Sequence, residues 1–220
     1  MAGALQHPWN TGIEEARALQ IQLAGLVEES DRFGELRRVA GVDLSGVGPS
    51  GKATAAAVLL SFPALERREG RRVQGYLEFP YVPGYLSFRE APLMLEALRA
   101  LEMEPDLILV DGHGRAHPRR LGIACHLGLL ADKPTIGCAK SVLVGKYGDL
   151  REEAGATAPL VDKGEVIGLA IRTKAGAKPI FVSVGHRISL PTAADLVLRC
   201  TLPGQRIPEP TRQAHKLAAQ

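Results

Sequence analysis

Hydrophobic residues recur along the chain at two different spacings. Near the N-terminus they lie three or four residues apart, at Ile13, Ala16, Leu19, Leu23, Leu26 and Val27. This spacing predicts an amphipathic helix, and the capping-box spacing of Thr11 and Glu14 predicts that the helix starts there. From Val39 onward the pattern changes to short apolar runs between polar or glycine-rich segments, which is typical of β-strands.

Three runs in the first half of the chain are candidate strands. Val39–Leu44 and Val73–Phe79 fit a strand, with Glu69-Gly70 as a turn before the second. Ala53–Phe62 is ambiguous, because its alanines suit a helix while its last residues, Val58–Phe62, suit a strand. If Ala53–Phe62 is a strand, the three runs form an antiparallel meander.

The second half of the chain alternates strands with helices. Ser87 and Glu90 have capping-box spacing at the start of a helix that runs to about Leu101. Leu107–Val110 is a continuous apolar run that ends in Asp111, which is the pattern of a buried parallel strand. The other expected elements are a helix near Leu121–Leu130, strands near Pro134–Cys138, Val166–Thr173 and Ile180–Val184, a helix after Thr192, and a short helix over Thr211–Ala219. This order predicts an α/β fold in which helices cover a mixed sheet.

Length and composition fit one globular domain. The chain has 220 residues, of which 45% are hydrophobic and 23% charged, so we expect a single domain over residues 1–220. Its apolar runs are too short to span a membrane, and the first residues do not resemble a secretory signal. Cys125, Cys138 and Cys200 lack CxxC spacing, which argues against a disulfide framework and a zinc ribbon. We therefore expect a cytoplasmic protein.

Charge adds a modest indication of a polyanionic partner. The net charge is +3, which permits such a partner without requiring it. Arginines cluster at two places, at Arg67, Arg68, Arg71 and Arg72 and at Arg115, Arg119 and Arg120. We interpret the first cluster as a solvated turn. The second adjoins Asp111 and is a candidate for phosphate contact.

Two carboxylates accompany apolar strands. Asp43 lies inside or just after Val39–Leu44, where a charge is costly unless it is paired or bound to a metal. Asp111 follows Leu107–Val110, and open α/β sheets bind ligands at the C-terminal ends of their strands. The two could hold Mg²⁺, which prefers oxygen ligands, or each could cap a loop. Glu90, by pattern alone, is the capping-box glutamate of its helix.

A glycine-rich segment offers a different enzymatic interpretation. Gly46–Lys52 matches the G-x-x-x-x-G-K part of a P-loop, and Leu107–Asp111 resembles a Walker B segment. However, Ala53 stands where a P-loop needs a hydroxyl for Mg²⁺. We therefore favour a hairpin turn, and a P-loop phosphotransferase is the alternative enzyme.

Two histidines have the spacing of metal ligands on a helix. His113 and His117 lie four residues apart, but Gly114 and Pro118 disfavour a helix at this position. A zinc site would need the loop to fold suitably. We favour polar loop histidines over zinc ligands.

Five segments, taken in order, resemble the endonuclease V family. They are Gly41–Ser45, Phe79–Glu90, Leu109–Gly114, Gly137–Ser141 and Pro208–His215. Together they extend over most of the chain, from about Val39 to His215. The loop Pro80-Tyr81-Val82-Pro83, which runs into Ser87-Phe88-Arg89-Glu90, is the most specific of the matches.

The resemblance implies an RNase H-like fold and a DNA repair endonuclease. Such an enzyme recognises deaminated bases, chiefly deoxyinosine, and hydrolyses the bond one nucleotide beyond the 3′ side of the lesion. It implies a Mg²⁺ cofactor, with Mn²⁺ able to substitute, held by Asp43, Glu90 and Asp111. Lys140 and His215 match further positions of the catalytic region.

The resemblance also implies DNA-contacting residues. Tyr81 matches a wedge that separates the strands, and the expected contacts around the base are Pro83, Gly84, Leu86, Gly112, His117 and Ser141. The expected partner is inosine-containing DNA, with RNA left open, and the expected state is a monomer without membrane contact. A non-catalytic nucleic-acid-binding module is the alternative from another class. The retention of Asp43, Glu90 and Asp111 argues against that module.

Overall fold

Nine strands form one mixed sheet in the computed structural model, which describes residues 7–47 and 50–220. The strands are β1 (Arg38–Ser45), β2 (Lys52–Ser61), β3 (Arg67–Tyr76), β4 (Leu107–Val110), β5 (Thr135–Ala139), β6 (Lys146–Tyr147), β7 (Thr157–Asp162), β8 (Glu165–Ile171) and β9 (Ile180–His186). Their order across the sheet is β3-β2-β1-β4-β5-β9-β8-β7-β6. Only the adjacent pairs β1–β4 and β4–β5 are parallel. This is the RNase H-like mixed sheet that the sequence predicted.

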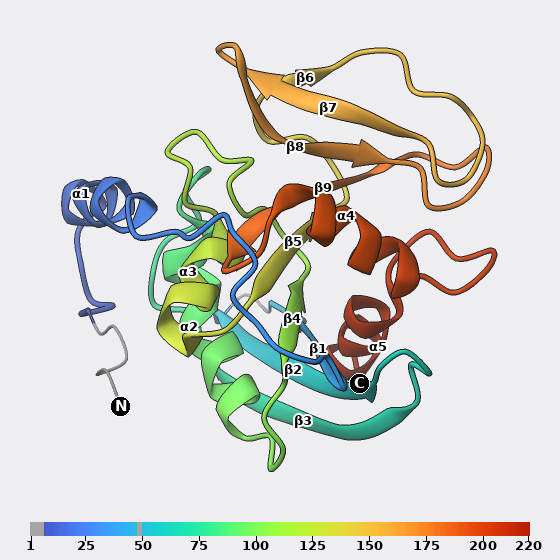
Figure 1. Ribbon diagram of the computed structural model, residues 1–220. Coiled ribbons are helices and arrows are strands. Elements are labelled where there is room, and N and C mark those ends of the chain that lie inside the picture. The colour runs from blue at the N-terminus through green and yellow to red at the C-terminus, as the bar shows by residue number, and fades with distance from the viewer. Residues whose placement is uncertain (1–6, 48–49) are drawn as a thin grey trace.

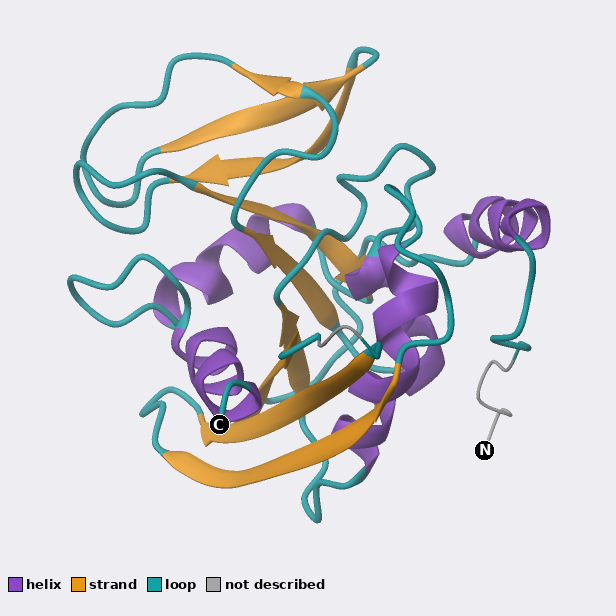
Figure 2. Ribbon diagram, turned by 180° about the vertical axis from the view of Figure 1, so that it is seen from behind, coloured by secondary structure: helices purple, strands orange, loops and turns teal. Residues whose placement is uncertain are grey.

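Helices cover both faces of the central strands. They are α1 (Ile13–Ala24), α2 (Leu86–Arg99), α3 (Ile123–Ala131), α4 (Leu190–Arg199) and α5 (Glu209–Ala218). Two views from opposite sides show α2 and α3 on one face and α4 and α5 on the other, with α1 at the periphery (Figures 1 and 2). None of the helices described in the structure is both long and apolar enough to cross a membrane.

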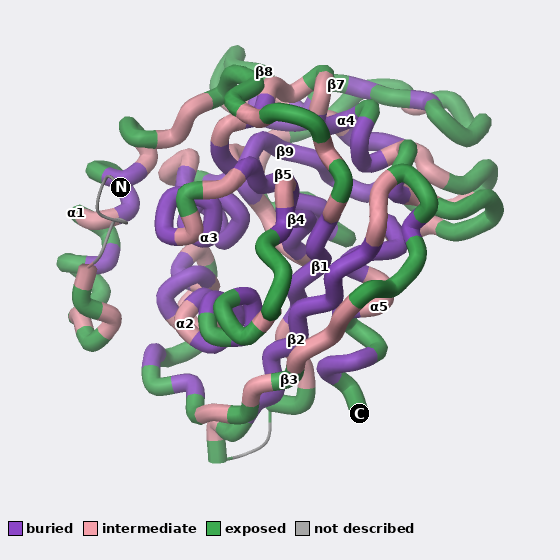
Figure 3. The backbone as a smooth tube through the Cα atoms, turned by 60° about the horizontal axis from the view of Figure 1, so that its bottom comes forward, coloured by how far each residue is buried: buried purple, intermediate pink, exposed green. Residues whose placement is uncertain are grey.

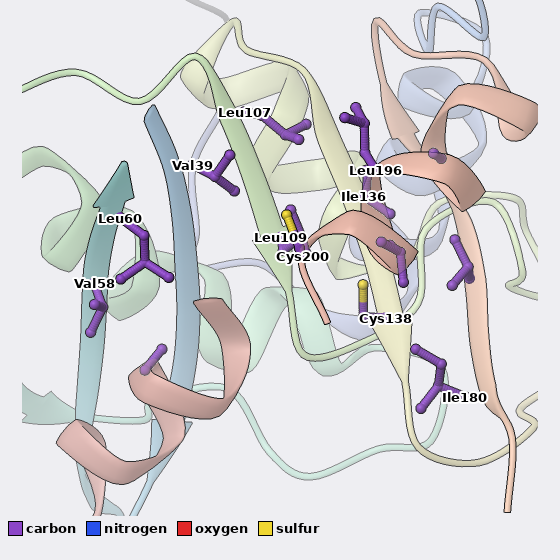
Figure 4. Packing of buried hydrophobic residues seen from close by; sticks show 14 of the residues in the cluster. Val39, Val58, Leu60, Leu107, Leu109, Ile136, Cys138, Ile180, Leu196 and Cys200 are labelled. Carbon is purple, nitrogen blue, oxygen red and sulfur yellow. The ribbon is translucent and has the colours of Figure 1, made fainter. Parts of the chain in front are cut away.

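The core follows from the alternation of side chains along the strands. On β1, Val39 packs into the cluster beneath α4 and α5, while its neighbour Ala40 packs into the cluster beneath α2 and α3. Figure 4 shows the first of these clusters, in which Leu196 lies above strand residues such as Leu109. Because both faces are covered, β4 is buried along its whole length (Figure 3). That burial explains why β4 is a continuous apolar run.

The parallel pairing of β1 and β4 places two carboxylates side by side toward the C-terminal ends of these strands. Val42 pairs with Val110, and the next residues are Asp43 and Asp111. On the same face of β1 as Asp43, a Cβ atom at Gly41 would lie 2.0 Å from the carbonyl oxygen of Pro210. A glycine at this position therefore lets α5 pack directly onto β1.

The connection between β1 and β2 excludes the P-loop interpretation. Lys52 begins β2, which pairs antiparallel with β1, whereas a P-loop leads from a strand into a helix. Within Gly46–Lys52, residues 48 and 49 lie outside the described part of the chain. Ala53–Phe62 corresponds to β2, so its strand interpretation is the correct one.

Neither expected capping box is present. α1 has Gly12 as its N-cap, and the Glu15 carboxylate, not Glu14, accepts the Gly12 N–H at 3.3 Å. α2 starts two residues earlier than the spacing predicted, because Tyr85 is its N-cap, and Ser87 is a buried residue inside the helix. The Ser87 hydroxyl has no hydrogen-bond partner among the described residues. α4 likewise starts earlier, at Leu190.

The edges of the sheet also differ from expectation. β3 already begins at Arg67, so Glu69-Gly70 lies within a strand, and the turn before it spans residues 61–66. The first arginine cluster therefore lies on an edge strand rather than in a turn. β6 and β7 were not predicted, because β6 has two exposed residues and β7 contains Pro159.

Candidate active site

Two aspartates and a histidine converge at the ends of β1 and β4. Asp43, Asp111 and His215 each place one potential ligand atom within 4.8 Å of the others, and they form the candidate metal-binding group in the described part of the chain. His215 comes from α5, which packs on β1 next to Asp43. Its Nδ1 lies 2.7 Å from Asp43 Oδ2 and donates a hydrogen bond when protonated.

Glu90 and Lys140 border this group. Burial raises the pKa of Glu90 to about 7, with further contributions from the charges of Asp43 and Asp111 and an opposing effect of Arg89. Glu90 is therefore close enough to interact electrostatically with both aspartates, although its carboxylate is not among the atoms within 4.8 Å. Lys140 follows β5, and its Nζ forms an ion pair with Asp111 Oδ2.

The charge balance suits a divalent cation. Burial, followed by the charge of Asp111, raises the pKa of Asp43, and similar causes act on Glu90. The shifts indicate that nearby cations only partly offset clustered carboxylates. Oxygen donors with one imidazole suit Mg²⁺ or Mn²⁺ better than a metal that prefers thiolates. Asp43, Glu90, Asp111 and His215 therefore fit such an ion.

A cavity of about 260 Å³ is lined by residues that are close in sequence to this group: Ser141 follows Lys140, and His113 lies two residues after Asp111. Of the residues that the sequence assigned to DNA contact, six line it: Tyr81, Pro83, Gly84, Leu86, His117 and Ser141. Gly112 is outside the lining but supports it, since a Cβ atom there would lie 2.5 Å from the side chain of Ile123. The lining residues that were not singled out for DNA contact are Val82, Ser87, His113, Gly122, Ile123, Val142 and Leu143. Only adjacency to the motifs could have indicated them, since most are apolar or small.

The two loop histidines are neutral near pH 7. Burial lowers the pKa of His113 and of His117 to about 4, with the Arg119 charge a second cause for His117. His117 Nε2 donates to the Gly84 carbonyl oxygen at 2.9 Å, and its Nδ1 accepts the Arg119 N–H at 3.2 Å. Neither histidine belongs to a metal-binding group among the described residues. Their arrangement supports a pocket wall rather than a zinc site.

Two arginines of the second cluster form ion pairs within the protein. Arg115 pairs with Glu29 at 3.0 Å, and Arg120 pairs with Asp162 at 2.9 Å and with Glu165 at 2.8 Å. The Arg120 pairs join the loop after β4 to the β7–β8 hairpin, and the Arg115 pair joins it to the segment after α1. The phosphate-contact interpretation overlooked partners that only the tertiary structure brings close.

The chain is similar to known endonucleases in sequence and in fold. The Endonuclease V family model matches residues 21–216. Endonuclease V of Roseiflexus castenholzii is 50% identical over 220 residues, which is 100% of this chain and 98% of that protein. The crystal structure of Endonuclease V from Streptomyces avermitilis has a TM-score of 0.90 and 44% identity, covering 97% of this chain and 94% of that one. Ciona intestinalis Endonuclease V, solved with a 24mer DNA containing an inosine followed by a ribo-adenosine, has a TM-score of 0.80 and 32% identity, covering 94% and 95%.

Proposed function

The chain belongs to the Endonuclease V family of DNA endonucleases, and from this we propose that it is a divalent-metal-dependent repair enzyme for deaminated bases, chiefly deoxyinosine. In this proposal it hydrolyses the phosphodiester bond one nucleotide beyond the 3′ side of the lesion. The observation that carries the proposal is the convergence of Asp43, Asp111 and His215, together with a cavity whose wall includes Ser141, the residue after Lys140. The Ciona intestinalis relative was crystallised with inosine-containing DNA, which supports the same substrate class here.

Each charged or polar residue of the candidate site has a defined part in the proposed reaction. Asp43, Glu90 and Asp111 would hold the cation, and the hydrogen bond from His215 orients the Asp43 carboxylate. When bound, a divalent cation stabilises the charge that develops on the phosphate and activates the attacking water. Lys140 presents an ammonium group beside Asp111, where it can offset phosphate charge.

The cavity is the proposed site for the lesion base. A base within a duplex must leave the stack to be inspected, and weak pairing of inosine lowers that cost. Gly84, Leu86 and Ser141 contribute to the wall that would surround the flipped base, together with Pro83 and His117, and Gly112 supports that wall behind Ile123. Because the ring nitrogens of His117 are already hydrogen-bonded within the protein, we assign this residue to shaping the wall.

Tyr81 is the proposed wedge. Its side chain is 74% exposed at the rim of the cavity, although aromatic residues are more often buried. Pro80 and Pro83 restrict the loop that carries it, so the ring is presented at modest entropic cost. Insertion of such a side chain between base steps would occupy the space that the flipped base leaves.

The acidic side chains also argue against the alternative of a non-catalytic nucleic-acid-binding module. Such a module has no need for carboxylates whose pKa values are raised by burial and mutual repulsion, as those of Asp43 and Glu90 are. Cleavage of RNA stays open, and the monomeric state and the cytoplasmic location stay predictions.

The substrate assignment is tested with three labelled substrates of one sequence. The first is a duplex with one deoxyinosine, the second has deoxyadenosine in its place, and the third carries inosine in an RNA strand. With Mg²⁺ present, we expect a single product from the first duplex, cut one nucleotide beyond the lesion, and no comparable product from the second. Equal cutting of the two duplexes, or none of the first, contradicts the assignment. The third substrate decides the question of RNA.

A further inference from the structure

The Gly84 carbonyl oxygen accepts hydrogen bonds from three side chains. Arg119 Nη2 donates at 2.7 Å, His117 Nε2 at 2.9 Å and Gln20 Nε2 at 3.0 Å. A carbonyl oxygen has two lone pairs, so three donors saturate it. The peptide plane between Gly84 and Tyr85 is therefore held in one orientation.

Two of these side chains, Arg119 and Gln20, are also hydrogen-bonded to each other. Arg119 Nε donates to Gln20 Oε1 at 2.5 Å, and the guanidinium carbon of Arg119 lies 4.3 Å from the centre of the Tyr85 ring. Gln20 Nε2 also donates a longer, weaker hydrogen bond to the Leu121 carbonyl oxygen, at 3.4 Å. The guanidinium is thus engaged along its edge and on its face, which leaves it poorly placed to bind phosphate.

Gln20 is a fully buried polar residue on a largely exposed helix. Its relative exposure is 0%, and only Ala16 and Leu23 are buried beside it on α1. A buried amide is costly unless it is hydrogen-bonded, and here its oxygen and nitrogen are both used. Networks of this kind rigidify the groups that they join. α1, which lies at the edge of the molecule in Figure 1, is thereby linked to the cavity wall.

The position of Gly84 makes the wall depend on this network. Gly84 has φ of +82°, a conformation that residues other than glycine rarely adopt. It also lies between Pro83 and Tyr85, the N-cap of α2, and it lines the cavity itself. A free Gly84 peptide would let both the wall and the preceding Tyr81 loop change shape.

We propose that Gln20 and Arg119 are positioning residues that hold the Gly84 peptide so that the base pocket is formed before the substrate arrives. This inference rests on the proposed function, because it assigns the pocket to the lesion base. Preorganisation reduces the ordering cost of binding. Its loss therefore affects recognition of the lesion more than the chemical step.

The test replaces Gln20 with leucine, which keeps the approximate size and removes the hydrogen bonds. Gln22→Leu is the matched control, since it makes the same change at an exposed position of α1. Arg119→Lys is a second variant, which keeps the charge and loses the forked donor geometry. Thermal unfolding shows which variants are folded, and each folded variant is assayed on deoxyinosine and deoxyadenosine strands of one sequence.

We expect Gln20→Leu and Arg119→Lys to raise KM for the deoxyinosine strand about five- to tenfold, with a smaller change in kcat, as loss of one net hydrogen bond predicts. Affinity for the deoxyadenosine strand stays at the parent value. Hydrogen exchange of amides in residues 81–86 rises in both variants and not in Gln22→Leu.

Two results overturn the inference. One is unchanged exchange in residues 81–86, and the other is an equal loss of affinity for both strands. If the parent enzyme does not cut the deoxyinosine strand, the proposed function fails instead. The exchange measurement, which needs no substrate, still decides whether Gln20 and Arg119 hold the loop.

Discussion

At the scale of single residues, the site combines charge with burial. Asp43 and Glu90 have raised pKa values, and Asp111 is paired with Lys140. The sequence indicated these side chains through strand ends and through a family resemblance. Spacing alone also suggested that Glu90 caps α2. The structure excludes that role, because the N-cap of α2 is Tyr85 and not Ser87. Cap geometry depends on backbone angles that spacing alone does not determine.

The raised pKa of Glu90 makes the stability of the metal-free protein depend on pH. Its pKa is raised from 4.5 to about 7, so folding favours the protonated form. The resulting destabilisation is absent below pH 4.5, develops between pH 4.5 and 7, and is complete above that range. We therefore expect metal-free Glu90→Gln to melt a few degrees above the parent at pH 8, since about 1 kcal/mol shifts Tm by about 2–4 °C.

The same measurement near pH 4.5 should find no difference between Glu90→Gln and the parent. Glu96→Gln, an exposed change on the same helix, is the control and should follow the parent at both pH values. A Glu90→Gln variant that melts below the parent at pH 8 would show that Glu90 is stabilising as a carboxylate. The electrostatic description of the site would then be wrong.

Tyr81 gives a second prediction at this scale. Base–aromatic stacking contributes about 1–3 kcal/mol, so Tyr81→Ala should weaken binding and cutting of duplex inosine substrates roughly ten- to a hundredfold. The loss should be smaller on single strands, because no partner strand is displaced. Tyr76→Ala, which removes another exposed tyrosine outside the cavity, should behave as the parent. If Tyr81→Ala cuts both the duplex and the single-stranded inosine substrate as well as the parent does, the wedge role is wrong.

At the scale of elements, one close packing contact brings α5 to the site. A Cβ atom at Gly41 would lie 2.0 Å from a backbone oxygen of α5, and backbone yields less readily than a side chain. Gly41→Ala should therefore displace α5 and with it His215. We expect a destabilisation of about 1–3 kcal/mol, the range for overpacking, together with slower cleavage. Chemical denaturation and initial rates measure the two effects.

Gly148→Ala is the control for this prediction, because nothing lies within 4 Å of the added Cβ atom. Its stability and cleavage rate should match those of the parent. If Gly41→Ala retained full stability and full activity, the contact between α5 and β1 would not be what positions His215.

Elements with both faces buried were predictable from the sequence, and exposed ones were not. β4 has the predicted bounds, Leu107–Val110, because burial on both faces leaves a continuous apolar run. β3 was misplaced because its arginines lie on an edge strand, where one side faces solvent and polar residues are tolerated. β6 is too short to produce a pattern, since it consists of Lys146 and Tyr147.

At the scale of the whole molecule, topology determines which residues meet. The parallel β1–β4 pair brings Asp43 next to Asp111, although they are far apart in sequence, and α5 adds His215 from the other end of the chain. The sequence predicted the sheet type and these site residues. It could not predict the link from Gln20 to Arg119, because such contacts depend on how α1 docks, and the apolar pattern of a helix does not specify its docking site.

The central claim is that the protein cuts DNA only when a divalent cation is bound at Asp43, Glu90 and Asp111. Its most direct measurement is the initial rate on a deoxyinosine duplex, with excess chelator and after Mg²⁺ or Mn²⁺ is restored, for the parent, Asp43→Asn, Asp111→Asn and the exposed control Asp149→Asn. We expect the parent and the control to cut only with cation. The two site variants should fold normally and cut at least about a hundredfold more slowly, as expected for loss of electrostatic stabilisation. Undiminished cutting by the parent in chelator, or full rates for both site variants, would contradict the account.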